Sequence, residues 1–485
     1  MNKKYNKQEN KNLLYKQKTN LILKIFYIFI FIFIILYFPT PIWHFPDGMG
    51  YYSYLPVLFE QKNYDFKPLF ELYTNNIGVT DKGFVINDFN CGTAVMWFPS
   101  YIISRIFESR RISIIFVNFF SSLLGLFSLF FVYKTLLLFN CDKLVAKIIL
   151  LFIFFGSPLV FYSYVIPQNP HTITSFLCSA YLYFWFSTYR QKSLSRWVIL
   201  GLILGLASLV REQEVLFGVT LLFEIFVDII DNKKIDKFYL KAIPVFILTF
   251  LFVFTPYFLN LWIIFGKIFI PKGYTISLKE FSLSSVLDVI FSAYHGLLWW
   301  TPVLVLGIVG LFLRLKRNFV VSSSFMSILF SQIFLISVVV APGGGSSFGI
   351  RYLTDCSSIF AFGIYQIYLL LKNKKVRLLF LSICSILSLW TIVLVILSAK
   401  GYIDLLEPYT IKEFFDIITK NVSNVIKIKF PPRIFLNYDE YFFIFILFIL
   451  VFGITKLLYS LNKKFSTCLF FTTTIILITI LFNTK

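Results

Sequence analysis

The sequence predicts an all-α, polytopic integral membrane protein, and three observations lead to this class. The 485 residues are 58% hydrophobic, with a mean hydropathy of +0.79, whereas a soluble domain averages about 45–50% apolar residues. Apolar runs of about 20 residues, the length needed to cross the hydrocarbon core, recur along the whole chain. Basic residues cluster in alternate polar gaps between these runs, which is the positive-inside pattern.

The chain begins with a lysine-rich segment, residues 1–20, which we expect to be a basic cytoplasmic tail. The first predicted span covers residues 21–43 and leads to an outer segment at 44–111. Within that segment GYYSYLPVLF and TAVMWFPSYII combine apolar residues with Tyr and Trp. Aromatic residues of this kind favour the headgroup level, so we expect interfacial helices in the first outer loop.

Twelve further apolar runs bring the total to about 13 transmembrane helices. They lie at residues 112–133, 144–166, 172–189, 197–210, 214–230, 242–264, 297–313, 318–341, 352–371, 378–399, 441–461 and 465–482. With the N-terminus inside, almost all of the net charge of +21 falls on the cytoplasmic side. We therefore divide the chain into the tail, a transmembrane core at 21–399, an outer loop or small cap at 400–440 and a C-terminal helix pair at 441–485.

Several functional classes are excluded by the same patterns. No compact basic patch with interleaved aromatic residues is present, so the positive charge does not indicate nucleic-acid binding. The six cysteines show neither the spacing of a zinc site nor a disulfide framework. The glycine-rich run GGGSSFGIR (343–351) lacks the GK[ST] ending of a phosphate loop, so it does not predict an ATP site.

The ionisable residues that carry the functional prediction gather at the outer ends of the predicted spans. Such residues are costly within a bilayer, so a set that converges on one side indicates a polar cavity. The set comprises His44, Asp47, Asp81, Asp88, His171, Arg211, His295 and Arg351.

Each of these residues also has a structural interpretation. Asp47 could act as a proton acceptor or cap the helix that follows it. Arg211 could grip a phosphate with its guanidinium fork or form a local ion pair with Glu212 or Glu214. Asp81 and Asp88 could simply lie on a loop surface. His171 and His295 could be capping residues, and the run 343–351 could hold a phosphate or simply form an outer turn.

At these residues the sequence resembles bacterial multi-pass glycosyltransferases of the C-type membrane fold (GT-C), relatives of the protein O-mannosyltransferases and the lipid A aminoarabinose transferase. The resemblance runs over roughly residues 20–375 and rests on the order and spacing of short motifs between the spans. These motifs are DGMGYYSYLP (47–56), NDFNCGTAVMWFP (87–99), YVIPQNPHTITSFLCSAYLYFW (164–185), LGLASLVRE (204–212), FGKIFIPKGY (265–274), SAYHGLLWWTP (292–302) and GSSFGIRY (345–352).

The resemblance implies a GT-C-like fold and transfer of a sugar from a polyprenyl-phosphate donor to a glycan, lipid or protein acceptor. It assigns the role of catalytic base to Asp47. It also implies that Arg211 and Arg351 hold the donor phosphate, with Tyr274, His295, His171, Asp88 and Tyr51 as further substrate-binding candidates. Many relatives carry paired acids in the first loop, whereas Gly48 follows Asp47 here. No cofactor is therefore certain, and a divalent metal stays open.

We accordingly expect a glycosyltransferase of the plasma (inner) membrane that works on the non-cytoplasmic face by a single inverting displacement. Two alternatives are a transporter or flippase of lipid-linked glycans and a catalytically inactive scaffold of the same fold. A transporter should place ionisable residues near the middle of the membrane and often has repeated halves. Here these residues lie at one face and the halves are not repeated.

Overall fold

The computed structural model describes residues 47–72, 78–268, 283–339 and 347–426. Within these ranges the chain is helical and forms no β-strand, and a single isolated bridge pairs Val79 with Val85. The predicted all-α class is thus confirmed. The predicted spans at 21–43, 441–461 and 465–482, together with His44 and Tyr274, lie outside the described residues.

Among the residues that the structure describes, five helical stretches are long and apolar enough to cross a membrane, which confirms a polytopic membrane protein. The total of about 13 spans stays a prediction. The five stretches are Ile112–Leu138 within α5 (Arg110–Leu138), α11 (Tyr239–Phe265), Phe319–Val338 within α15 (Phe319–Val339), η6 with α16 (Arg351–Cys356 and Ser357–Leu370), and α17 (Lys374–Ala399).

The remaining helices of the bundle are shorter. They are α6 (Lys143–Phe155), α7 (Leu159–Tyr164), α8 (His171–Ser187), α9 (Leu194–Val210), η3 (Glu212–Gly218), α10 (Val219–Asn232), α12 (Leu283–Phe291), α13 (Leu297–Trp300) and α14 (Pro302–Leu313).

Four of the predicted spans are interrupted or begin irregularly. The span at 297–313 divides into α13 and α14 at Thr301. The span at 144–166 divides into α6 and α7 around Gly156 and Pro158, because proline lacks the N–H that a continuing helix needs. A Cβ on Gly156 would lie only 2.4 Å from Val303 Cγ1, so the break also lets α14 approach closely. The spans at 214–230 and 352–371 open with the 3₁₀ turns η3 and η6. These turns place Arg211 and Arg351 directly at the helix junctions.

Glycines allow close contacts between helices of the bundle, and side-chain caps stabilise the starts of single helices. A Cβ on Gly201 would lie 2.1 Å from Thr249 Oγ1, and one on Gly310 would lie 1.8 Å from Gly363 O. The first contact joins α9 to α11 and the second joins α14 to α16, as expected where small residues let helices meet. At the start of α6 the Asp142 side chain accepts hydrogen bonds from two backbone N–H groups, and at the start of α17 the Asn373 side chain accepts one.

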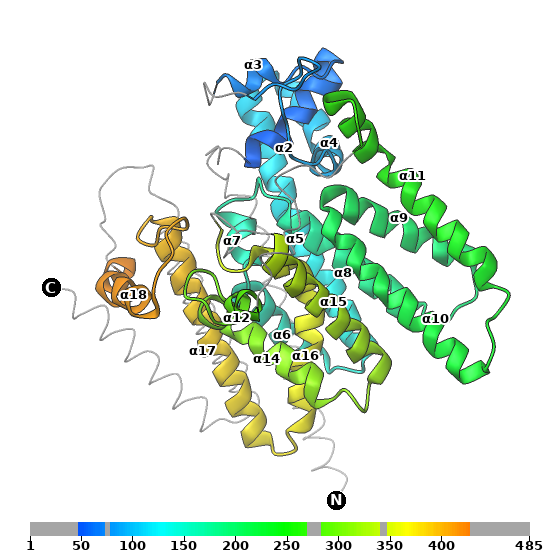
Figure 1. Cartoon of the computed structure of the whole chain (residues 1–485). Helices are drawn as coiled ribbons and strands as arrows, with labels where there is room; N and C mark the ends of the chain where they lie inside the picture. Colours follow the sequence, from blue (N-terminus) through cyan, green and yellow to red (C-terminus); the bar gives the residue numbers. More distant parts are fainter. Residues whose placement is uncertain (1–46, 73–77, 269–282, 340–346, 427–485) are drawn as a thin grey trace, which may run out of the picture.

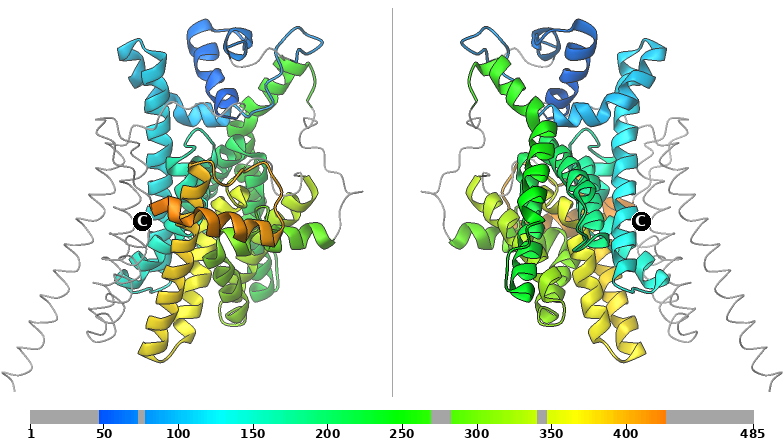
Figure 2. Two further views of the ribbon diagram at one scale, coloured as in Figure 1. Left: turned by 90° about the vertical axis from the view of Figure 1, so that its left-hand side faces the viewer. Right: turned by 90° about the vertical axis from the view of Figure 1, so that its right-hand side faces the viewer.

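The helices alternate in direction, so distant parts of the chain meet at one end of the bundle (Figure 1). At that end lies a cluster formed by α2 (Asp47–Pro56), η1 (Val57–Gln61), α3 (Lys67–Phe70), α4 (Gly92–Ser104) and η2 (Arg105–Phe107). The amphipathic helix α18 (Ile411–Ile426) crosses the end of α17 (Figure 2). The domain boundaries drawn from the sequence stay predictions.

Candidate functional site

Asp47 and Arg351 form an ion pair although 304 residues separate them in the chain. Arg351 Nη1 donates a hydrogen bond to Asp47 Oδ2 at 3.1 Å. Asp47 opens α2, while Arg351 opens η6. The Asp47 side chain is 30% exposed, so its carboxylate is held in place yet can still be reached.

The placement of Asp47 depends on how closely α2 packs against its neighbours. A Cβ on Gly48 would lie 2.8 Å from Gln168 Cβ, and one on Gly50 would lie 1.9 Å from Phe89 Cδ2. The Asn87 amide donates hydrogen bonds to Gly50 O (3.0 Å) and to Ser53 Oγ (3.1 Å). Only glycine permits these approaches, and the two hydrogen bonds fix the start of α2 relative to the 87–90 loop.

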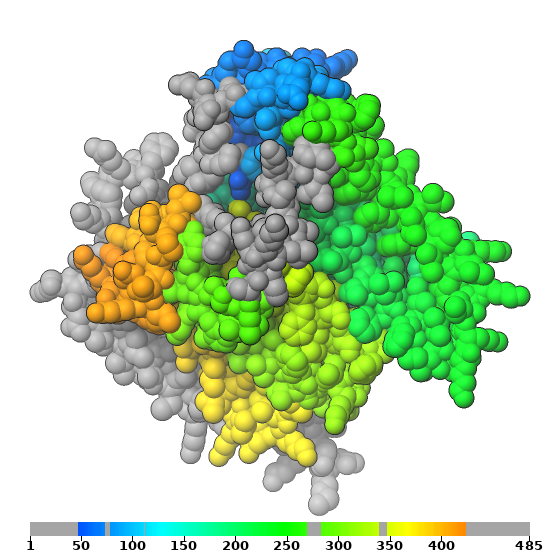
Figure 3. Space-filling model, in the orientation of Figure 1, coloured from blue at the N-terminus to red at the C-terminus, as the bar shows by residue number. Residues whose placement is uncertain are grey.

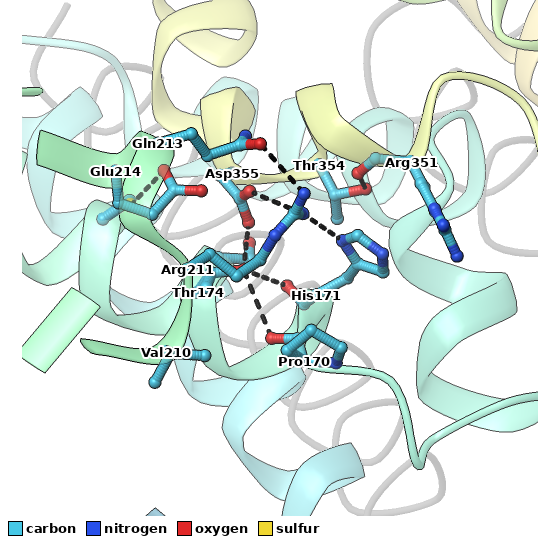
Figure 4. A network of polar contacts seen from close by, with 12 residues as sticks. Pro170, His171, Thr174, Val210, Arg211, Gln213, Glu214, Arg351, Thr354 and Asp355 are labelled. Carbon is cyan, nitrogen blue, oxygen red and sulfur yellow. Dashed lines mark hydrogen bonds and ion pairs between the residues drawn. The ribbon is translucent and has the colours of Figure 1, made fainter. Parts of the chain in front are cut away.

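Arg211 is the residue that follows the last turn of α9. Its backbone is extended (φ −149°, ψ 120°), so the chain leaves the helix at this residue. Its Nη1 lies 2.9 Å from His171 Nδ1, and its Nη2 donates to Gln213 Oε1 at 2.9 Å (Figure 4). A guanidinium group has no acceptor, so His171 Nδ1 must accept this bond and carries no proton. His171 is therefore a neutral partner and does not itself offset the charge of Arg211.

Tyr352 connects the two arginines. Its ring centroid lies 4.3 Å from the guanidinium carbon of Arg211 and 5.3 Å from that of Arg351. Both distances are within the range of cation–π attraction, which offsets part of the repulsion between two neighbouring positive charges.

These side chains line one cavity of about 320 Å³. Figure 3 shows the surface hollowed between the blue α2–α4 cluster and the rest of the bundle. The polar part of the lining comprises Asp47, Tyr51, Asn90, His171, Arg211, Glu212, Gln213, Arg351 and Tyr352. The rest of the lining comprises the apolar residues Phe89, Pro170, Val210, Val215, Leu216, Leu335 and Ile336, together with a third tyrosine, Tyr257. The cavity can therefore take a molecule with an anionic group at one end and an apolar body.

Four of the predicted site residues besides Asp47 lie on this cavity: Tyr51, His171, Arg211 and Arg351. His295 does not line it; it is buried against the rings of Tyr294 and Trp300. Asp88 precedes the lining residues Phe89 and Asn90 but is not part of the lining itself.

Sequence reasoning missed several residues that hold Arg211. Its ion pair is with Asp355, 3.7 Å from Nη1, rather than with the adjacent Glu212 or Glu214. Gln332 Oε1 accepts from the Gln213 amide at 2.8 Å. Asp355 was detectable in principle, because it is an acidic residue inside the apolar run 352–371. Gln332, in a long apolar helix, gave no such signal.

No group of three or more His, Cys, Asp and Glu side chains suited to a metal ion occurs among the residues that the structure describes.

The comparisons with known proteins give one result. Residues 94–259 match the family model of the dolichyl-phosphate-mannose-protein mannosyltransferases. This match confirms the resemblance to GT-C-type glycosyltransferases. It runs from the first turn of α4 into α11 and includes His171 and Arg211, but not Asp47 or Arg351. No curated protein and no solved structure matches the chain.

Proposed function

We propose that the chain transfers a sugar from a polyprenyl-phosphate donor to an acceptor hydroxyl group, with Asp47 as general base. The observation that carries the proposal is that Asp47, Arg211 and Arg351 line the same cavity. The family match supports a glycosyltransferase of this class and a lipid-linked sugar as its donor. We extend this to a site at the non-cytoplasmic face of the plasma membrane, from the distribution of basic residues.

The proposed reaction is a single displacement. The acceptor oxygen forms a bond to the anomeric carbon as the bond from that carbon to the phosphate oxygen breaks, and the configuration inverts. The acceptor proton passes to the Asp47 carboxylate, and the bonding electron pair leaves with the phosphate. A phosphate leaves without being protonated, so one base suffices, in contrast to the two carboxyl groups of glycosidases.

The two arginines supply the electrostatic part of this reaction. Negative charge grows on the departing phosphate, and donors already aimed at that position stabilise it more in the transition state than in the ground state. Arg211 uses one N–H for His171 and one for Gln213, so its five-donor fork keeps capacity for a ligand. The apolar lining, including Val215, Leu216 and Leu335, suits the first units of a prenyl chain.

Asp47→Asn tests the proposed base. In membranes supplied with a radiolabelled polyprenyl-phosphate sugar, we expect transfer to fall by at least about 10²-fold, within the usual range for loss of a general base. The amide keeps the size of the side chain but cannot take the proton. Asp81→Asn is a matched control, because Asp81 is exposed and outside the cavity. Unchanged transfer by Asp47→Asn would remove this residue from the mechanism.

Arg351→Ala tests the phosphate assignment. We expect KM for the donor to rise by about tenfold or more, since a charge-assisted hydrogen bond to phosphate contributes about 1.5–3 kcal/mol. Undiminished donor affinity would contradict the assignment of Arg351.

A further inference from the structure

A pair of buried carboxyl groups that the reaction itself does not use lies beside Arg211. Glu214 comes from η3 and Asp355 from η6, and both are 0% exposed. Neither lines the cavity. Figure 4 shows them side by side next to the Arg211 guanidinium. Two buried acids beside one cation are expensive unless their charges and hydrogen bonds are matched.

Hydrogen bonding accounts for one oxygen of each carboxyl group. Asp355 Oδ1 accepts from the Thr174 hydroxyl. Glu214 Oε2 accepts from Cys178 Sγ at 3.2 Å and from Gln332 Nε2 at 3.5 Å. The other two oxygens, Glu214 Oε1 and Asp355 Oδ2, are buried and find no hydrogen-bond donor in the described part of the chain.

The Glu214 and Asp355 carboxyl groups lie next to each other in Figure 4, and each has one of these buried oxygens. If both were ionised, two acceptor oxygens would face each other without a proton in a site closed to water. A single shared proton turns this repulsion into a hydrogen bond and satisfies both orphaned oxygens.

The surroundings decide which residue carries the proton. Asp355 Oδ2 is 3.7 Å from Arg211 Nη1, and Asp355 also accepts the Thr174 hydroxyl, so its neighbours favour the ionised form. Glu214 is held by a thiol, a weak donor, and by a long amide contact. The proton therefore belongs on Glu214.

We propose that Glu214 and Asp355 are positioning residues for Arg211, with Glu214 protonated and donating to Asp355 and the single charge on Asp355 holding the guanidinium toward the cavity. One negative charge is the arrangement that suits donor binding. Two negative charges on the carboxyl pair would cancel more than the charge of Arg211 and weaken its attraction for phosphate. A pair with no negative charge would leave the buried Arg211 cation without a counter-ion. The consequence for donor binding rests on the proposed function, but the shared proton does not.

The proton can be observed without any substrate. A protonated carboxylic acid has a C=O stretching band that is separate from the bands of a carboxylate. Infrared spectra of the full chain in lipid nanodiscs should contain this band, and subtracting the spectrum of a variant from that of the unmodified chain shows whether the variant has lost it. We expect Glu214→Gln to remove this band and Glu212→Gln, the same change two residues earlier in η3, to leave it in place. A spectrum in which Glu214→Gln removes only carboxylate bands would overturn the proposal.

The positioning role is tested by binding of polyprenyl phosphate to the same nanodiscs. Glu214→Gln keeps a neutral donor to Asp355, so we expect its affinity to stay within about twofold of the unmodified chain. Asp355→Asn removes the charge beside Arg211, so we expect affinity to fall by about tenfold, which corresponds to about 1.4 kcal/mol. Equal losses in the two variants, or no loss in Asp355→Asn, would contradict the role.

The two measurements separate the two proposals. If the unmodified chain binds no polyprenyl phosphate while the acid band behaves as expected, the proposed function fails and the shared proton stands. If Asp355→Asn does not fold, the infrared spectra still test the shared proton. The affinity of Glu214→Gln for polyprenyl phosphate still tests the positioning role.

Discussion

Helix α9 carries an arginine at each end, and the two are bound in opposite ways. Arg196, in its first turn, makes a double hydrogen bond with Glu224 (2.9 and 2.6 Å) and donates from Nε to Thr188 Oγ1 at 2.9 Å. Glu224 also accepts from Trp185 Nε1 at 2.9 Å and from the backbone of Arg190 at 3.0 Å. Both charged groups are almost fully enclosed, with side chains 3% and 1% exposed.

Arg211, at the other end of α9, has neutral hydrogen-bond partners and a longer ion pair. It contacts His171 and Gln213 at 2.9 Å, and its carboxylate partner, Asp355, is 3.7 Å away. It also lines the cavity, which Arg196 does not. A buried arginine with an ideal bidentate partner stabilises the fold, whereas one with neutral partners and an open side is available for a ligand.

Arg196→Ala should have the largest effect on stability. It leaves Glu224 buried without its cation, so we expect a loss of about 3–5 kcal/mol in the free energy of unfolding. Thermal unfolding of the detergent-solubilised chain measures this. The double variant Arg196→Ala/Glu224→Ala removes both charges and should recover part of the loss. No difference between the single and double variants would show that the pair is not the cause.

Arg211→Ala should affect donor binding more than stability. We expect donor affinity to fall by about tenfold or more, because a charge-assisted hydrogen bond to phosphate is lost. Thermal stability should fall less than in Arg196→Ala, because the 3.7 Å ion pair with Asp355 is longer than the bidentate pair of Arg196 and Glu224. Arg211→Lys keeps the charge but loses the planar fork. Its affinity for the donor should therefore lie between that of the unmodified chain and that of Arg211→Ala. If Arg211→Ala destabilises the chain as strongly as Arg196→Ala and leaves donor affinity intact, the contrast between the two ends of α9 is wrong.

Gln213→Ala and Thr188→Ala give the finest comparison, since each removes one hydrogen bond to one of the two arginines. A single hydrogen bond contributes about 1 kcal/mol, so we expect about a fivefold rise in the donor KM for Gln213→Ala. Thr188→Ala should lower the melting temperature slightly and leave KM unchanged. A shift of KM in Thr188→Ala but not in Gln213→Ala would reverse our assignment.

The sequence predicted the fold class and the meeting of Asp47, Arg211 and Arg351, because both follow from local rules. Apolar run length determines which segments can span, and alternating direction brings residues at every second helix end to the same side. Gly201 and Gly205, four residues apart on α9, both lie against α11, a contact that follows from the same kind of local rule because small residues let helices approach closely.

The partners of Arg211 could not be predicted in the same way. Its two nearest acids in sequence, Glu212 and Glu214, are in η3, yet its ion pair is with Asp355, which lies 144 residues later in the chain. His295 looked equivalent to His171 at the end of a span, yet it packs against Trp300. Such choices depend on how helices rotate and pack against each other, which a single sequence does not specify.

The central claim is that one cavity binds the phosphate of a lipid-linked sugar between the two arginines and Asp47. The most direct measurement is a structure of the chain in nanodiscs with polyprenyl phosphate bound. We predict phosphate density within hydrogen-bonding distance of both Arg211 and Arg351, with the prenyl chain leaving past Leu216 and Leu335. Phosphate bound elsewhere, with this cavity empty, would contradict the account.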